Sequence, residues 1–329
     1  MKVLVIGAAG LLGSNLVRTL LQKGDQVRGL VRPTSKLLGL AGLDLEMVAG
    51  DLGDVNSLKR GCEGIDVVYQ TASYYPTETI PASEAKQQAL AETNNLLQAI
   101  AQTSVGRLVF TSTLTTIGFP TVPGQLASEE CVFSTKFTGN PYLIAKAAME
   151  EEVLAAARDG LPAVVVNPTA FFGPYDKRPT SGTQILMIAK HQMPGYIQGP
   201  VNVIDVRDVA AAMIRAAEVG KVGERYIVGN WNTSQKDLNR LIAKVVGVSP
   251  PLFPVPFVVA QAGSRAGEWA SRKILHKPSP VPSFFVEVIR HMQHYDCSKA
   301  LHALGYPQSS VEAAIRDAVT WFRENGYLK

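Results

Sequence analysis

The sequence predicts a doubly wound α/β protein with a smaller, mostly helical C-terminal substrate domain. The first half of the chain alternates short β-branched runs with segments of helical periodicity, and these runs are apolar throughout. Strands that are apolar on both faces are typical of a parallel sheet covered by helices on its two sides. After Phe172 the regular alternation loosens, which favours a second unit.

The expected elements follow in chain order. The β-branched runs predict strands at Lys2–Ile6, Gln26–Val31, Leu45–Val48, Asp66–Tyr69 and Arg107–Thr111. The periodic segments between them predict helices at Leu11–Gln22, Val55–Gly61 and Ala82–Gln102. A helix over Pro141–Arg158 and a strand over Ala163–Asn167 extend the same sheet. Proline-containing stretches separate later helices at Val209–Glu218, Ser234–Val246, Val258–Ile274 and Ser310–Asn325.

The chain length also favours two units, since 329 residues exceed the size at which one core usually keeps growing. We expect the sheet domain at residues 1–172 and the cap mainly at residues 173–329. The run Glu224–Val228 has the pattern of a strand, so the chain is expected to return to the sheet around residues 201–230. A cleft between two such units is a common place for a ligand.

The composition is that of an ordinary folded protein, with 46% hydrophobic and 18% charged residues. The net charge of +4 comes from 32 basic and 28 acidic residues that are spread along the chain, which disfavours a nucleic-acid partner. Cys62, Cys131 and Cys297 are too few and too far apart for a disulfide framework, and the dispersed histidines suggest no metal site. We therefore expect a cytoplasmic protein without a metal.

The segment Val245–Ser264 is uncharged over about the length that spans a bilayer. It contains four prolines, at positions 250, 251, 254 and 256. Prolines would break the internal hydrogen bonding that a lipid-exposed helix must keep. We therefore predict a loop followed by a buried helix, and no membrane span.

A glycine-rich turn directly follows the first strand, with the spacing Gly7-x-x-Gly10-x-x-Gly13, and it opens an apolar helix. A glycine at the strand end permits a tight turn, the second lets the backbone approach a pyrophosphate, and the third permits close packing of helix and strand. The free N–H groups and the dipole at the helix start favour an anion. A glycine-rich turn without a ligand is the alternative, but strand, spacing and helix together predict a dinucleotide site on a Rossmann domain.

The end of the second strand indicates which dinucleotide binds. An acid usually stands there to bind the adenosine ribose of NAD, whereas this chain has Arg28-Gly-Leu-Val-Arg32. Because a guanidinium can hold a 2′-phosphate bidentately, Arg32 favours NADP, with NAD as the alternative cofactor. Arg32 could also be only a solvated charge. Asp51 follows the third strand and could accept from the adenine amino group or form a simple turn.

Tyr142 and Lys146 are four residues apart at the start of a predicted helix, so they share one face. A cation beside a phenol favours the phenolate and is expected to lower the tyrosine pKa toward the working pH. An isolated pair of this kind is more often structural. Here the fifth strand ends in Thr111-Ser112-Thr113, where hydroxyls could hold a substrate oxygen beside Tyr142.

At this point the sequence resembles the extended short-chain dehydrogenase/reductases, also called the NAD-dependent epimerase/dehydratase family, over most of its length. The resemblance implies that Tyr142 and Lys146 are catalytic and that Thr113 is the active-site hydroxyl, with Ser112 as the fallback. It also implies that Lys146 binds the nicotinamide ribose and that Asn167-Pro168-Thr169 flanks the nicotinamide. The pattern from Asn167 to Thr180 looks closest to the hopanoid-associated sugar-epimerase-like and dihydroflavonol-reductase-like branch.

The residues and the resemblance together give the expected contacts of the cofactor. They are Gly7, Gly10, Leu12, Gly13, Arg32, Asp51, Leu52, Thr71, Ala72, Ser73, Lys146, Pro168 and Thr169.

Two positions depart from the family pattern. Ala89 stands where an asparagine is frequent, so a proton-relay role there is in doubt, although Asn94 and Asn95 are nearby. Val201 stands where nucleotide-sugar enzymes usually carry an arginine that holds a diphosphate. Losing that ion pair weakens the case for a sugar-nucleotide substrate.

We therefore expect an NADP-dependent oxidoreductase that reduces a carbonyl compound. The alternatives are a nucleotide-sugar epimerase or dehydratase with tightly held NAD(P), and a non-catalytic NADP-sensing protein. The partner is expected to be a small-molecule carbonyl or sugar substrate, and the resemblance implies a possible homodimer.

Overall fold

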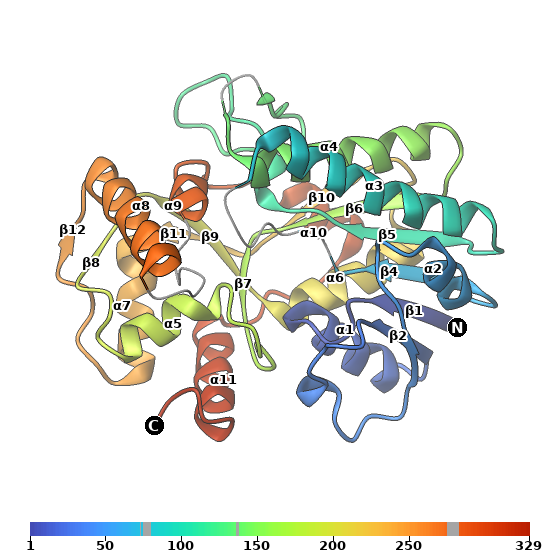
Figure 1. Ribbon diagram of the computed structural model, residues 1–329, viewed down its shortest axis with the longest axis horizontal. Coiled ribbons are helices and arrows are strands. Elements are labelled where there is room, and N and C mark those ends of the chain that lie inside the picture. Colours follow the sequence, from blue (N-terminus) through green and yellow to red (C-terminus); the bar gives the residue numbers. More distant parts are fainter. Residues whose placement is uncertain (73, 75–79, 136–137, 275–282) are drawn as a thin grey trace.

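The computed structural model describes residues 1–72, 74, 80–135, 138–274 and 283–329, and it is built around one seven-stranded parallel sheet (Figure 1). The strand order is β10-β6-β5-β4-β1-β2-β3. The chain thus winds outward from β1 in both directions, so a topological switch point lies between β1 and β4. The strands are β1 (Lys2–Ile6), β2 (Gln26–Val31), β3 (Glu46–Ala49), β4 (Val67–Gln70), β5 (Arg107–Thr111), β6 (Ala163–Pro168) and β10 (Arg225–Val228).

The predicted doubly wound architecture is therefore confirmed. The bounds of β1, β2 and β5 agree with the sequence prediction, while β3 and β4 begin one residue later than predicted. The reason for the good agreement is that nearly every residue of β1, β4 and β6 is buried, so the apolar runs coincide with the strands. The run Glu224–Val228 contains β10, which pairs with β6 in parallel.

Helices cover both faces of this sheet. On one face, α2 (Val55–Cys62), α3 (Ala82–Ala101) and α4 (Pro141–Arg158) pack against alternate strand residues such as Leu4 and Phe110. The other face carries α1 (Leu11–Gln22), α6 (Val206–Val219) and α10 (Ser298–Leu304). Since successive side chains of a strand point to opposite faces, each apolar strand serves two cores.

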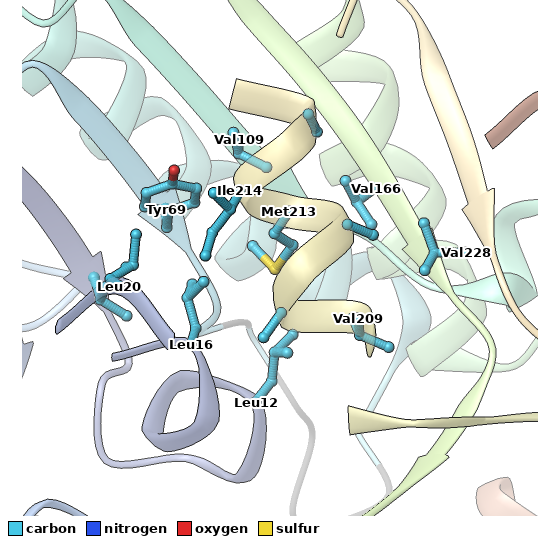
Figure 2. Packing of buried hydrophobic residues seen from close by; sticks show 14 of the residues in the cluster. Leu12, Leu16, Leu20, Tyr69, Val109, Val166, Val209, Met213, Ile214 and Val228 are labelled. Atoms are coloured by element: carbon cyan, nitrogen blue, oxygen red, sulfur yellow. The ribbon is translucent and has the colours of Figure 1, made fainter. Parts of the chain in front are cut away.

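The position of α6 shows that the sheet is completed by the second half of the chain. In Figure 2, Val209, Met213 and Ile214 of α6 lie between the leucines of α1 and the valines of the sheet. Met213 is fully buried. Late sequence thus contributes to the core of the N-terminal sheet.

The second unit contains more β-structure than predicted. It has a three-stranded sheet of β11 (Trp231–Ser234), β9 (Pro200–Asp205) and β7 (Ala170–Phe172), and a short pair of β8 (Gly195–Tyr196) and β12 (Phe253–Pro254). Its own core is enclosed by α5 (Gly182–Ala189), α7 (Gln235–Val246) and α11 (Val311–Glu324). Strands β7, β8 and β12 have only two or three residues, too few for a pattern in sequence, while β9 and β11 contain polar residues and so are not continuous apolar runs.

The uncharged segment Val245–Ser264 is divided as its prolines predict. Helix α7 ends at Val246, Gly247 follows in the left-handed conformation, and a short loop leads to α8 (Phe257–Lys273). Helix α8 exposes Val258, Val259 and Trp269 to solvent, and Ser271 is the one position among its described side chains that is buried, so the prediction of a buried helix is wrong. Helix α9 (Ser283–Ile289) follows. Among the described residues, no helix is both long and apolar enough to cross a membrane.

Candidate active site

The glycine turn joins β1 to α1 at the carboxyl edge of the sheet. Gly7 has a φ of 83°, and a Cβ at this position would lie 2.6 Å from the amide nitrogen of Ala72. A Cβ on Gly13 would lie only 2.2 Å from the carbonyl oxygen of Gly7. Gly10 is different, because it is exposed and a Cβ there would meet only the Gly7 oxygen, at 3.3 Å. The fold itself therefore requires Gly7 and Gly13, whereas Gly10 leaves the surface open.

The start of α1 fits an anion. Gly10 occupies the N-cap, and within the described parts of the chain no side chain caps this helix. The first-turn amides, including that of Leu12, thus have no side-chain acceptor. A dinucleotide pyrophosphate would find free N–H donors, the positive end of a helix dipole and no Cβ in its way.

At the end of β2, the two arginines of the sequence motif have different environments. Arg28 is structural, because its guanidinium donates to the carbonyl oxygens of Gly61 and Glu63, both at 2.8 Å, and pairs with Glu46 at 2.8 Å. Arg32 is exposed at the carboxyl end of the same strand. Only Arg32 is therefore placed where it could meet a ligand.

Asp51 and Leu52 follow β3. The Asp51 carboxylate accepts from the amide of Gly53 at 2.9 Å, which is the turn-forming arrangement that the sequence left open. The Leu52 carbonyl accepts from the side chain of Asn95 on α3, also at 2.9 Å. Asn95 thereby ties α3 to the loop that would border an adenine.

The residues after β4 and β6 line the same edge. The Thr71 hydroxyl donates to the Ile6 carbonyl at 2.8 Å, and the Ala72 amide donates to the same oxygen at 3.0 Å. Ser73 lies outside the described residues. Pro168 ends β6, and the Thr169 hydroxyl is buried without a hydrogen-bond partner within the described chain.

Tyr142 and Lys146 are positioned by the start of α4. The Asn140 side chain is the N-cap and accepts from the amides of Tyr142 and Leu143, at 3.0 and 3.3 Å. Pro141 at the first helical position fits the same helix start. The Lys146 ammonium lies 5.7 Å from the centre of the Tyr142 ring. The predicted pair thus shares one face of α4, on which Lys146 is buried and Tyr142 is half-buried.

The pKa of Tyr142 differs from the sequence expectation, and the pKa of Lys146 is also shifted. Burial raises the pKa of Tyr142, while hydrogen bonds with Thr113 and Thr115 oppose this rise. The expectation that Lys146 lowers the tyrosine pKa is therefore wrong for this structure, because desolvation of the phenolate dominates. Burial also lowers the pKa of Lys146 to about 8, and Glu92 acts in the opposite direction.

Thr113, rather than Ser112, reaches Tyr142. Thr113 caps the short helix η2 (Leu114–Thr116) and accepts from the Thr115 amide at 3.3 Å. Its side chain hydrogen-bonds Tyr142. The Ser112 hydroxyl instead lies 3.4 Å from that of Thr116. The threonine assigned by spacing is therefore the one that the fold brings to the tyrosine.

A buried hydrogen-bond network that the sequence did not reveal holds the segment of Thr113 against α4 and β6. The Glu150 carboxylate, one turn beyond Lys146, accepts from Thr116 and Asn167, both at 2.6 Å, and pairs with Arg225 at 2.8 Å. The Asn167 amide also donates to the Thr113 carbonyl at 3.2 Å. The Asn140 cap before Pro141 could have been recognised from sequence. The pairing of Glu150 with Arg225 could not, because the two residues are 75 positions apart in the chain.

The two departures from the family pattern are core residues. Ala89 on α3 is fully buried in the core between the helices and the sheet, and its methyl side chain offers no polar group to a proton relay. Val201 is 1% exposed, belongs to the core of the second unit and pairs with Thr233 of β11. Glu92 on α3 was not singled out from the sequence. Burial raises its pKa, and the charges of Asp51, Arg32 and Lys146 also act on this pKa, so Glu92 lies near these candidate residues.

The amino edge of the sheet, opposite the candidate site, also carries a hollow. A hollow of about 350 Å³ lies where β1 and β2 begin and is lined by Lys2, Asp25, Gln26, Arg28 and Glu46. Ligands of open α/β sheets bind outside the carboxyl ends of the strands, so this hollow is not the expected site. Within the described residues, no group of three or more His, Cys, Asp or Glu could hold a metal ion.

The chemistry of the site follows from this geometry. One edge of the sheet combines an open helix start, an exposed arginine, and a phenol held by two hydroxyls beside a buried lysine. Such a set can bind a dinucleotide and give or take a proton at an oxygen atom.

Comparisons with known proteins agree with this assignment. The model described as "NAD dependent epimerase/dehydratase family" matches residues 3–229. The chain is 35% identical over 336 aligned residues to the "Putative dihydroflavonol 4-reductase" of Synechocystis sp., with 99% of this chain and 95% of the relative covered. It is 31% identical to "Sterol demethylase protein B" of Methylococcus capsulatus, with 100% of both proteins covered.

The solved structures show the same relationship at the level of the fold. The crystal structure of a nucleoside-diphosphate-sugar epimerase from Pseudomonas aeruginosa matches with a TM-score of 0.84 and 29% identity. That match covers 100% of this chain and 99% of the epimerase.

Proposed function

Since the chain belongs to the NAD dependent epimerase/dehydratase family, we propose that it is an NADP-dependent reductase that converts an aldehyde or ketone into an alcohol. That it is an NAD(P)-dependent enzyme follows from the family and from its relatives. This leaves the non-catalytic, NADP-sensing alternative without support. The observation that carries the proposal is Tyr142, hydrogen-bonded by Thr113 on a helix that also presents Lys146.

The proposed reaction assigns one role to each of these residues. The bound nicotinamide supplies the hydride that reduces the carbonyl carbon. Tyr142 gives its hydroxyl proton to the carbonyl oxygen, and Thr113 holds that oxygen in place. Lys146 stabilises the phenolate that remains and binds the ribose. Because desolvation raises the pKa of half-buried Tyr142, its hydroxyl keeps its proton and can act as the acid in this direction.

The cofactor is proposed to be NADP because of the charges at the end of β2. Arg32 is exposed there, and among the described residues no carboxylate stands at the position where NAD enzymes bind the ribose. A guanidinium can bind a phosphate through two parallel N–H groups. The substrate is proposed to be less polar than a sugar nucleotide, because Val201 lies in a core and offers no charge.

The proposed setting is the cytoplasm, where Cys62, Cys131 and Cys297 stay reduced; all three are free thiols. A homodimer is proposed from the family resemblance, and its oligomeric state can be checked by light scattering.

Replacing Tyr142 with phenylalanine tests the reductase proposal. We expect Tyr142→Phe to lose about 10²-fold or more in kcat, the usual contribution of a positioned general acid. The ring and its contact with Phe284 remain, so NADPH should bind unchanged in a fluorescence titration. Full turnover by Tyr142→Phe with NADPH and a carbonyl substrate would overturn the assignment.

The competing function is a nucleotide-sugar epimerase or dehydratase, which the resemblance to the Pseudomonas aeruginosa epimerase favours. Such an enzyme returns the hydride to its substrate, so the nicotinamide absorbance does not change at the end of the reaction. A net fall in NADPH absorbance with a carbonyl substrate supports the reductase. An unchanged absorbance with altered sugar stereochemistry supports the epimerase.

A further inference from the structure

We propose that Lys177, on the loop between β7 and α5, binds the 2′-phosphate of NADP together with Arg32. This inference rests on the proposed NADP specificity. It adds a residue from the far half of the sequence to the phosphate site. The site would then be formed jointly by the segment after β2 and by the loop that leads into the second unit.

The loop after β7 packs against helix α1 of the sheet domain. In Figure 1 it runs down between α11 and α1. The Asn15 side chain of α1 donates to the Pro174 carbonyl at 3.0 Å. The Arg18 guanidinium lies 4.1 Å from the centre of the Tyr175 ring and donates to the Gly39 carbonyl at 3.1 Å. One arginine of α1 therefore contacts both the loop and the segment that follows β2.

The backbone of the loop is held in an unusual conformation at this contact. Tyr175 has a φ of 76°, in the left-handed region that residues other than glycine rarely adopt. Its Cβ lies where it would contact any side chain on Gly39, at 3.4 Å. Such a conformation persists only where the surroundings enforce it. The close packing fixes the path of the two residues that follow, Asp176 and Lys177.

Lys177 is held at both its backbone and its side chain. The Tyr327 hydroxyl, beyond α11, donates to the Lys177 carbonyl at 2.7 Å. The Lys177 ammonium donates to the carbonyl of Lys36, four residues after Arg32. An ammonium has three N–H donors, so two remain for a ligand. The lysine is thus fixed beside the segment that carries the NADP-selecting arginine.

Four cations gather at this point: Arg32, Lys36, Lys177 and Arg178. Across the described residues none of them forms a salt bridge with a carboxylate. Burial lowers the pKa of Lys177 to about 8, and the charges of Arg178, Arg32 and Lys36 act in the same direction. Only Lys177 is partly buried, while Arg32, Lys36 and Arg178 are exposed, and the repulsion between these like charges is relieved when an anion binds among them. A phosphate monoester, with a charge near −2, is the ligand chemistry that this cluster fits.

The consequence concerns selectivity between the two cofactors. NADPH and NADH differ only in the 2′-phosphate, so contacts to that group change one affinity and not the other. A charge-assisted hydrogen bond from Lys177 should therefore favour NADPH alone. The pyrophosphate and nicotinamide contacts lie elsewhere, at the start of α1 and near Tyr142.

The test compares dissociation constants of NADPH and NADH for the full-length enzyme and four variants. We expect Lys177→Gln to weaken NADPH about 10-fold or more, as for one charged hydrogen bond, and to leave NADH within about twofold. Lys177→Arg should restore most of the affinity. Lys190→Gln, an exposed lysine at the end of α5, is the matched control and should change neither constant. Competition by 2′-AMP should weaken in Lys177→Gln, while competition by 5′-AMP should not.

Arg32→Gln distinguishes the proposal that the cofactor is NADP from the proposal that Lys177 binds its 2′-phosphate. If Arg32→Gln weakens NADPH and Lys177→Gln does not, the NADP assignment stands and the Lys177 assignment fails. An equal loss of NADPH and NADH affinity in Lys177→Gln would show a structural role of the loop and would also overturn the inference. If the unmodified enzyme binds NADH as well as NADPH, the proposed cofactor itself is wrong.

Discussion

Gly10 and Gly13 of the turn after β1 are required for different reasons. Gly13 packs against the carbonyl oxygen of Gly7, so any side chain would push α1 away from β1. Gly10 has an ordinary φ of −78° and is exposed, so the fold has room for a methyl group there. One motif thus combines a residue needed by the fold with one that the proposed cofactor needs.

This difference gives a prediction at the residue scale. We expect Gly10→Ala to retain its melting temperature but to bind NADPH about 10-fold more weakly or worse, because the methyl group would keep the pyrophosphate from the backbone. Gly13→Ala should instead lower the melting temperature sharply. Calorimetry and fluorescence titration measure the two effects. Equal destabilisation by both substitutions would show that the fold requires Gly10 as well.

Among the elements, the start of α5 depends on a buried carboxyl. The Asp176 side chain is 3% exposed and accepts from the amides of Thr180 and Gly182, at 3.4 and 3.2 Å. Burial nevertheless raises the pKa of Asp176 to about 6, since desolvation outweighs these two hydrogen bonds. The folded protein therefore favours the protonated form of this group more than the unfolded chain does.

The raised pKa predicts how stability changes with pH. Between about pH 4 and pH 6 the folded state holds a proton that the unfolded state has lost, so Asp176 lowers the free energy of unfolding as pH rises. From the ordinary value of 3.8 to about 6, the effect is at most about 3 kcal/mol. Asp176→Asn keeps an oxygen acceptor and should be more stable than the unmodified protein at pH 7, but not at pH 4. Urea unfolding at both values measures this.

Asp237→Asn is a control of opposite sign. A hydrogen bond with Ser234 lowers the pKa of Asp237, so this carboxylate stabilises the fold above its unfolded pKa and loses that effect in acid. The substitution should therefore destabilise the protein at pH 7. Parallel stability profiles for the unmodified protein and Asp176→Asn would contradict the prediction for Asp176.

For the whole molecule, the two units are linked by α6. Its residues fill the core beneath the parallel sheet (Figure 2). At its start, Arg207 pairs with Asp205 of β9 and Asp317 of α11. Near the same helix start, the Asp208 carboxylate accepts from the amide and hydroxyl of Ser309, at 2.6 and 2.7 Å. One helix thus contacts both cores, so we expect them to unfold together.

Met213→Ala tests this coupling. Removing a fully buried methionine side chain should cost about 2–5 kcal/mol. The three tryptophans, Trp231, Trp269 and Trp321, all belong to the second half of the chain, whereas circular dichroism reports on the entire molecule. Both signals should shift to lower urea together. A tryptophan transition that stays in place while the circular dichroism midpoint falls would show that the units unfold independently.

Much of the sheet domain and the set of candidate residues could be predicted from the sequence. Strands buried on both faces have continuous apolar runs, the glycine turn has fixed spacing, and Tyr142 and Lys146 are near neighbours on one helix. These are local signals, because each depends on residues within a few positions of one another.

The tertiary structure alone decided what depends on distant parts of the chain. Three-residue strands such as β7 have no pattern of their own, and the pairing of Glu150 with Arg225 joins residues 75 positions apart. The pKa of Tyr142 could not be predicted from its neighbour Lys146, because the pKa is raised by desolvation from surrounding elements and lowered by hydrogen bonds with Thr113 and Thr115. The contact between the loop of Lys177 and the segment after Arg32 likewise arises only when the second unit folds against α1. Sequence determined which residues could act, and packing determined their environment.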